Sequence, residues 1–415
     1  MDKIKKIIKL LFGYGGSQFL VILLPIILLP ILTRSLTVVE FADYSIYKVI
    51  SGLSTPIIAF ALSTFLLKNF YSSLKNTVKS FIFNSSIFSI LVTAVLIIIT
   101  LFLSDTLKVL LELNDHHVIV YAFINTCLFS IHTLLLTYYR AESNMKKFFM
   151  SNLSVFFITI GGVLFISNTN YMSLKLVLNI HMIGYLSSIL MGFIFFIKFN
   201  SKDFSLNKPL LKKAVSFSIP LVLYSIFTQI YTGTDKLIIN SMLTKIDLAS
   251  YSAIFQLSFG VSAAGNVLQL AFSPYLFKKM SSNKTIDKEI VKTILSITFG
   301  MIIFSMIYYL LFPFLIEVFL PVEYFLNIEI AKWFIIAGFM QVQYWIINPF
   351  LIIYEKNSYL LYIAIIAALV NIILNLIFIK NGVEYAAMIY CITWVIQYLG
   401  TLIAIYYAKK NFKTF

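Results

Sequence analysis

Long apolar runs alternate with short polar gaps along the whole chain. Each run is long enough to cross the roughly 30 Å hydrocarbon layer of a bilayer as a helix, at about 1.5 Å per residue. The pattern predicts twelve transmembrane helices, at residues 10–32, 41–67, 81–103, 118–139, 148–166, 176–197, 214–243, 248–277, 290–314, 328–354, 359–379 and 383–407.

The composition supports a membrane protein and excludes a soluble one. Of the 415 residues, 60% are hydrophobic and only 12% are charged, and the mean hydropathy is +0.93. A soluble chain of this length needs far more polar surface to cover its core. We therefore expect an all-α polytopic membrane protein.

The basic residues predict the orientation of these helices. Seven alternate gaps, counted from the N-terminus, hold 24 of the 32 Lys and Arg residues. The positive-inside rule then places both termini in the cytoplasm, and the opening MDKIKKIIK leads into an uncleaved first helix. The net charge of +15 is spread over these gaps, which favours contact with membrane lipids and argues against a nucleic-acid partner.

The helix count divides the chain near its midpoint. The polar segment at 198–213 separates six predicted helices from six, which gives an N-terminal bundle at 1–204 and a C-terminal bundle at 205–415. A shift of 207 residues lays FADYSIYK at 41–48 over LASYSAIF at 248–255, with three of eight positions identical. Two parallel repeats of this kind predict pseudo-symmetric bundles around a central cleft, a geometry suited to alternating access.

The motifs of several enzyme classes are missing from the sequence. No GxxxxGK[ST] phosphate loop and no HExxH zinc motif is present, and every gap between the apolar runs is short. Cys127 and Cys391 both fall within predicted spans, where packing is their expected role. We therefore expect no catalytic residue, no metal site and no bound cofactor.

Four ionisable residues lie within or at the ends of predicted spans: Arg34, Lys48, Asp235 and Lys236. Such groups are unfavourable in hydrocarbon and commonly face a wet cavity or a partner. One hypothesis is a cationic patch for an anionic head group, with Asp235 binding a coupling cation. The alternative is that Arg34 and Lys48 extend to the membrane surface while Asp235 pairs locally with Lys236 or with a neighbouring helix.

Neutral polar side chains within the spans allow two interpretations as well. Gln18 and Gln256 could line a sugar-binding cleft, or could join neighbouring helices by hydrogen bonds. Pro25, Pro30 and Pro220 bend the first helix of each half, which could create hinges or simply fixed kinks.

Three stretches carry a family resemblance. GSQFLVILLPIILLPILTRSL, TDKLIINSMLTKIDLASYSAIFQLSFG and LVNIILNLIFIKNGVEYAAM resemble the polysaccharide-exporter branch of the multidrug/oligosaccharidyl-lipid/polysaccharide superfamily, which includes O-antigen and capsule-repeat flippases. The resemblance runs along essentially the whole chain.

The resemblance implies a flippase that moves undecaprenyl-diphosphate-linked oligosaccharide across the bacterial cytoplasmic membrane. It implies coupling to an H⁺ or Na⁺ gradient, and a polymerase and chain-length regulator as pathway partners. The family's arginine at the end of helix one corresponds to Arg34 and its helix-seven aspartate to Asp235, followed here by Lys236. Arginine is otherwise scarce, so Lys48 could replace an arginine-rich cavity.

Two rival functions remain at this point. A drug/cation antiporter of the same superfamily would need acidic groups for cationic cargo, whereas three of the four candidate charges here are basic. An O-antigen polymerase is an enzyme of similar length, but the resemblance leads us to expect a large outer loop in such an enzyme, and this sequence has none. The charge pattern favours an anionic cargo.

Overall fold

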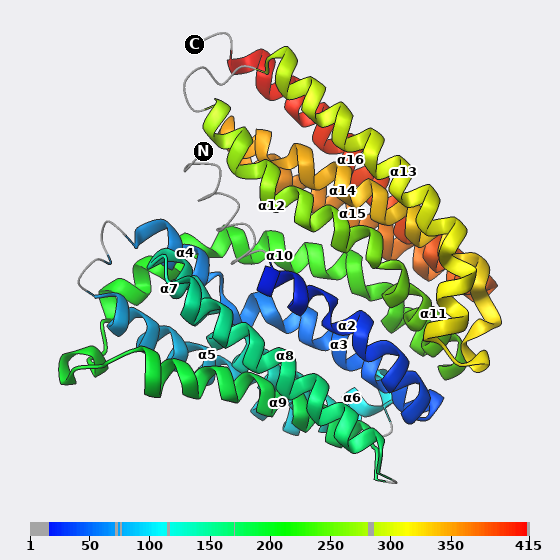
Figure 1. The fold of residues 1–415 in the computed structure, drawn as a ribbon, viewed down its shortest axis with the longest axis horizontal. Helices are drawn as coiled ribbons and strands as arrows, with labels where there is room; N and C mark the ends of the chain where they lie inside the picture. Colours follow the sequence, from blue (N-terminus) through cyan, green and yellow to red (C-terminus); the bar gives the residue numbers. More distant parts are fainter. Residues whose placement is uncertain are drawn as a thin grey trace. The chain divides into compact units, whose positions relative to one another are not determined.

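The protein is described by a computed structural model, which covers residues 16–70, 74, 77–113, 117–169, 171–280 and 286–412. Throughout these residues the chain is helical and contains no β-strand, as Figure 1 shows. The prediction of an all-α membrane fold is confirmed, because long apolar helices follow one another along the whole described chain.

The described residues of the first half form nine helical segments before residue 197. They are α2 (Gly16–Ser35), α3 (Val38–Ala59), α4 (Leu62–Asn69), α5 (Val78–Phe102), α6 (Ser104–Leu110), α7 (His117–Ala141), α8 (Met145–Ser167), α9 (Leu174–Leu190) and the π-helix η2 (Met191–Phe196). A short 3₁₀ turn, η3 (Ser201–Phe204), precedes the second half.

The second half begins with the longest helix. Its segments are α10 (Lys208–Met242), α11 (Lys245–Ser258), α12 (Gly260–Met280), α13 (Lys288–Phe319), the 3₁₀ segment η4 (Val322–Ile330), α14 (Ala331–Ile353), α15 (Asn357–Phe378), the 3₁₀ turn η5 (Ile379–Asn381) and α16 (Val383–Phe412). Gly382, whose φ is +126°, makes the turn between η5 and α16, a conformation that side chains other than glycine rarely adopt.

The helices follow the predicted spans in order, but some are interrupted. Among the described residues nine helices are long and apolar enough to cross a membrane, or ten if the bent pair α3 and α4 is one span. The predicted span 248–277 is divided at Phe259 into α11 and α12, and the start of the predicted span 10–32 lies outside the described residues.

The break between α3 and α4 has a local cause. Phe60 and Ala61 both take left-handed backbone angles, and the two helices meet at a bend of 44°. Such angles are unfavourable for side chains with a Cβ, so packing must hold them. Ser89 donates a hydrogen bond of 2.9 Å to the carbonyl of Ile58, which lies next to the break. The buried hydroxyl of Ser89 thus gives a hydrogen-bond donor to a carbonyl at the end of the interrupted helix.

The polarity of the packing is that of a protein in lipid. Large apolar side chains are exposed along the helices, among them Phe157, Phe299 and Leu310, while Asn152, Ser188 and Thr393 are buried. This distribution is expected where the solvent is hydrocarbon and small polar side chains join neighbouring helices. The exposed apolar surface therefore contacts lipid.

The chain packs as two compact units. The first comprises the described residues up to Leu24 together with Ser35–Gln229, and the second comprises Pro25–Arg34 and Ile230–Phe415. The predicted bundles at 1–204 and 205–415 follow the internal repeat and stay a prediction, since packing groups the residues of α2 and α10 differently.

The second helix of each predicted half begins in the same way. At α3 the hydroxyl of Thr37 accepts from the backbone of Glu40, whose carboxylate accepts from the Thr37 backbone. At α11, Thr244 and Asp247 form the same reciprocal pair. The two capping boxes are 207 residues apart, as the shift found in the sequence requires, and each satisfies backbone donors at a helix start.

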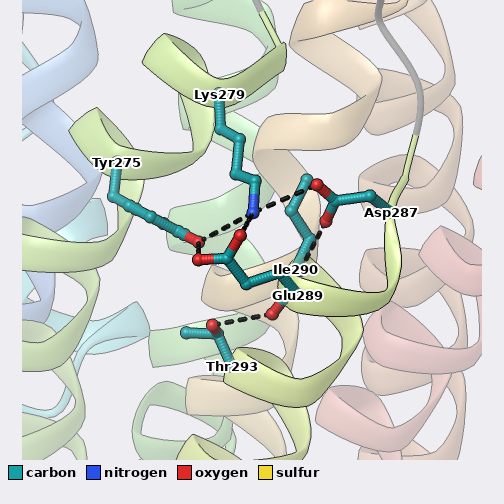
Figure 2. A network of polar contacts seen from close by, with 6 residues as sticks. All are labelled: Tyr275, Lys279, Asp287, Glu289, Ile290 and Thr293. Carbon is teal, nitrogen blue, oxygen red and sulfur yellow. Dashed lines mark hydrogen bonds and ion pairs between the residues drawn. The ribbon is translucent and has the colours of Figure 1, made fainter.

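A network of ion pairs connects the end of α12 to the start of α13 (Figure 2). Lys279 contacts the carboxylates of Asp287, at 3.0 Å, and Glu289, and it donates to the hydroxyl of Tyr275. Asp287 also caps α13 by accepting from the backbone of Ile290 at 2.7 Å. This hydrogen bond, followed by the nearby ammonium of Lys279, lowers the pKa of Asp287 below its ordinary value.

Substitution of Asp287 can distinguish the contribution of the helix cap to stability from that of the ion pair with Lys279. Asp287→Asn keeps a side-chain acceptor for the cap and removes the charge, whereas Asp287→Ala removes both, so we expect Asp287→Ala to lower the thermal unfolding midpoint more. Because the folded-state pKa of Asp287 is lowered, its carboxylate stabilises the fold above its ordinary pKa, and this contribution is lost as the pH falls through the folded value. Thermal unfolding is measured in detergent from neutral to strongly acidic pH, and the difference in unfolding midpoint between the wild type and Asp287→Ala should shrink at low pH. A difference in midpoint that grows on acidification would contradict this role of Asp287.

Candidate functional site

A lysine and two tyrosines on α3, with a histidine on α9, form the Lys48 cluster, defined as Tyr44, Tyr47, Lys48 and His181. The capping box fixes the start of α3, and Glu40 also accepts from the backbone of Leu174 at 3.2 Å, which ties this end of α3 to the start of α9. Tyr44 and His181 can therefore meet, and their side chains are buried against each other.

The tyrosines hold the Lys48 ammonium from one side. Its Nζ lies 5.3 Å from the ring centre of Tyr44 and 5.9 Å from that of Tyr47, distances at which an aromatic face attracts a cation. The two rings stack at 5.8 Å, and the Tyr44 hydroxyl lies 3.5 Å from Nε2 of His181. The side chain of Lys48 is itself exposed, so its ammonium can reach a ligand while the aromatic rings below it are buried.

Lys48 lies deeper along its helix than the sequence indicated. The sequence placed it seven residues into a span beginning at residue 41, but α3 begins at Val38, ten residues before Lys48. That separation is about 15 Å along the helix axis. A cation at such a position is a candidate for function.

The second cluster, the Asp235 cluster, is defined as Asp235, Lys236, Tyr251 and Phe255 and lies between α10 and α11. Asp235 is fully buried, and the hydroxyl of Tyr251 donates to its Oδ2. The Lys236 Nζ lies 3.9 Å from the Oδ1 of Asp235 and 3.8 Å from the ring centre of Phe255. A buried carboxylate thus has a hydroxyl donor and an ammonium partner, which makes the pair electrically neutral.

Aromatic side chains from α14 and α16 complete this environment. Phe334 packs edge-on against Tyr251 at 5.0 Å and against Phe255 at 5.2 Å, and Tyr390 packs against Phe255 at 5.3 Å. These apolar neighbours lower the local polarity, which strengthens the attraction between Asp235 and Lys236. The local pairing that the sequence left as an alternative for Asp235 is therefore present.

Arg34, Gln256 and Gln18 belong to neither cluster. The Arg34 guanidinium donates 2.8 Å to the carbonyl of Val318, one residue before the end of α13, where a cation is favourable. The Gln256 amide donates to the carbonyl of Pro25, the helix-joining use that the sequence left as an alternative. The side chain of Gln18 lies outside the described residues, and substrate contact by Gln18, Gln256 or Arg34 stays a prediction.

The sequence did not identify the tyrosines as site residues, although the repeat carried the signal. Tyr44 and Tyr251 occupy equivalent positions in the two repeats, both are buried, and each has a lysine ammonium near its ring. The structure places Asp235 and Lys236 together in the second unit and Lys48 in the first.

Solved structures with this fold are membrane transporters. The chain superposes on a multidrug resistance MATE family transporter of the MOP superfamily in its inward-facing conformation, with TM-score 0.69, 12% identity and 96% of each chain covered. The outward-facing conformation of a MATE family transporter gives TM-score 0.66 with 12% identity over 97% of this chain and 95% of that one. The lipid II flippase MurJ gives TM-score 0.63 with 14% identity over 89% of this chain and 85% of that one.

Sequence comparison assigns the family. A search of curated proteins gives no match, but the model of the polysaccharide biosynthesis protein family matches residues 11–278, which is more than half of the chain. The similar solved structures are those of MATE transporters and of a lipid II flippase, and they show the fold of this chain. The chain belongs to the polysaccharide biosynthesis protein family and has the fold of the MOP-superfamily transporters.

Proposed function

We propose that this protein is a flippase for a lipid-linked oligosaccharide, with undecaprenyl diphosphate as the lipid carrier, in the bacterial cytoplasmic membrane. The observation that carries the proposal is the exposed ammonium of Lys48, which lies within α3, the first helix of the bent pair, and is held over two buried tyrosine rings. A diphosphate is a strong acceptor for such a cation, and a surrounding of low polarity strengthens the contact.

The family and one structural neighbour support a lipid-linked cargo. The matching family is named for polysaccharide biosynthesis, and the similar fold of MurJ belongs to a lipid II flippase. In this proposal the diphosphate contacts Lys48, and the glycan follows through the protein by alternating access. Substrate contact by Arg34 and Lys236, which have partners of their own in the second unit, stays a prediction. O-antigen or capsule repeats are the proposed cargo.

A drug/cation antiporter is the second candidate, since MATE transporters share the fold. Such a transporter needs an acidic group that can receive a cation. Here the buried carboxylate of Asp235 already has Lys236 and Tyr251 as partners, which leaves it a weak receptor for a cationic drug. Export of a cationic dye that depends on this protein would favour the antiporter over the flippase.

Replacing Lys48 tests the proposed diphosphate contact. Lys48→Ala should abolish glycan display on cells that depend on this protein, because the cation above Tyr44 is lost, whereas Lys48→Arg should keep part of it. Lys68→Ala is a matched control, since Lys68 is exposed and lies 4.7 Å from the ring of Phe217, outside the cluster. Normal display with Lys48→Ala, at a normal protein level, would rule out this site.

Replacing Asp235 tests the buried pair and its proposed role in ion coupling. Asp235→Asn leaves the Lys236 ammonium buried without its charged partner, and breaking such a pair destabilises a protein by about 3–5 kcal/mol. Adding Lys236→Met removes the orphaned charge, so the double variant should recover most of the unfolding midpoint.

Transport by the stable double variant then isolates the coupling role. We expect it to lose the dependence on the proton or sodium gradient, because no ionisable group remains at the pair. The measurement is glycan translocation into vesicles with and without an imposed gradient. A gradient dependence equal to that of the wild type would assign coupling to another residue.

A further inference from the structure

Polar side chains lie between α15 and α16, apart from both candidate clusters. The members of this seam are Asn371, Asn375, Thr393, Gln397 and Thr401, and each is 0% exposed. The two helices are antiparallel neighbours in the second unit, joined by the short turn at η5 (Figure 1). In a fold surrounded by hydrocarbon, every buried polar group needs a hydrogen-bond partner.

Direct hydrogen bonds satisfy one end of the seam. The Asn371 amide donates to the Thr393 hydroxyl at 3.0 Å, and that hydroxyl donates to the carbonyl of Ile389 at 2.8 Å. The amide of Asn375 donates to the carbonyl of Asn371 at 2.9 Å. These bonds join α15 and α16 at the level of Thr393.

The other end of the seam has no such bonds. Neither the amide nitrogen nor the carbonyl oxygen of Gln397 has a partner among the described residues, and the same holds for the hydroxyl of Thr401. Gln397 lies one helical turn from Thr393, and Thr401 one turn further towards the C-terminus. The two N–H donors and the oxygen acceptor of the Gln397 amide are therefore buried without a hydrogen-bond partner among the described residues. The same is true of the Thr401 hydroxyl.

We propose that bound water occupies the seam around Gln397 and Thr401 and forms a hydrated path inside the second unit. A buried water molecule typically makes about three hydrogen bonds to otherwise unsatisfied polar groups, which matches the capacity left by these two side chains. The facing stretch of α15 carries Ala364, Ala367 and Ala368, whose side chains have no polar atom that could pair with Gln397 or Thr401. From Thr401 to Gln397 the path covers about 6 Å along α16.

This path leads towards the Asp235 cluster. Tyr390 lies three residues before Thr393 on α16, and its ring packs against Phe255 of that cluster at 5.3 Å. Gln397 lies seven residues from Tyr390, so water at Gln397 is about two helical turns from the aromatic side chains that surround Asp235.

Cysteine reactivity measures hydration directly. In a background of Cys127→Ala and Cys391→Ala, single cysteines are introduced as Gln397→Cys and Thr401→Cys. The control is Ala122→Cys, which is also 0% exposed and lies on α7 in the first unit, away from the seam.

A small water-soluble methanethiosulfonate reacts with thiolates, which form in water and not in dry packing. We expect both seam cysteines to react at least about tenfold faster than the control in the folded protein. Rates equal to that of Ala122→Cys would overturn the proposal. Thr401→Cys is nearly isosteric with the native residue, so it decides the test if Gln397→Cys does not fold.

Thermal unfolding gives an independent result. Thr401→Val keeps the side-chain shape and removes the hydroxyl, so its unfolding midpoint falls if water bonds that hydroxyl and rises if the hydroxyl is buried dry. Thr393→Val is the control, because its direct bonds require the midpoint to fall in either case. Neither experiment depends on the cargo, so a failure of the flippase proposal would leave this result unchanged.

Discussion

The structure depends on one constraint, which is that hydrocarbon cannot hydrogen-bond to a polar group. The chain meets it by forming helices, which satisfy the backbone, and by turning small polar side chains towards one another. Ser89 and Ser130, whose hydroxyls lie 3.2 Å apart between α5 and α7, illustrate the second device. Where a helix is broken, as at Phe60, a buried hydroxyl contacts a carbonyl near the gap. Polar groups left without a direct partner are therefore the places where water, ions or cargo are expected.

Under the same constraint, Lys48 and Lys236 have different kinds of partner. Lys236 is buried, and its ammonium is neutralised by Asp235 and lies against Phe255. Lys48 is exposed and held over aromatic rings. An aromatic face attracts a cation without neutralising it, so Lys48 keeps its charge for an anionic ligand. This difference in partners is the reason for proposing that Lys48 binds the substrate, whereas Lys236 belongs to a buried pair.

Much of the fold follows from hydropathy, but the fine structure of the helices does not. An average over about 20 residues finds apolar runs, yet it cannot detect the left-handed residues at Phe60 and Ala61, because those depend on packing. Adjacency in the sequence predicted the pairing of Asp235 with Lys236 as one of two alternatives. The contacts of Arg34 with Val318 and of Gln256 with Pro25 join residues more than 200 positions apart, which a single sequence does not encode in any local pattern.

The internal repeat allows the Lys48 cluster and the Asp235 cluster to be compared position by position. Both second helices start with a capping box, which fixes the helical phase and places Tyr44 and Tyr251 at equivalent positions. The residue equivalent to Lys48 is Phe255, so α11 supplies no cation of its own at this position. The cation comes instead from α10, as Lys236, and it brings Asp235 with it as the adjacent residue. A tyrosine beside a lysine is thus kept in both repeats, while the carboxylate that accompanies the second lysine converts an open cationic site into a closed, neutral one.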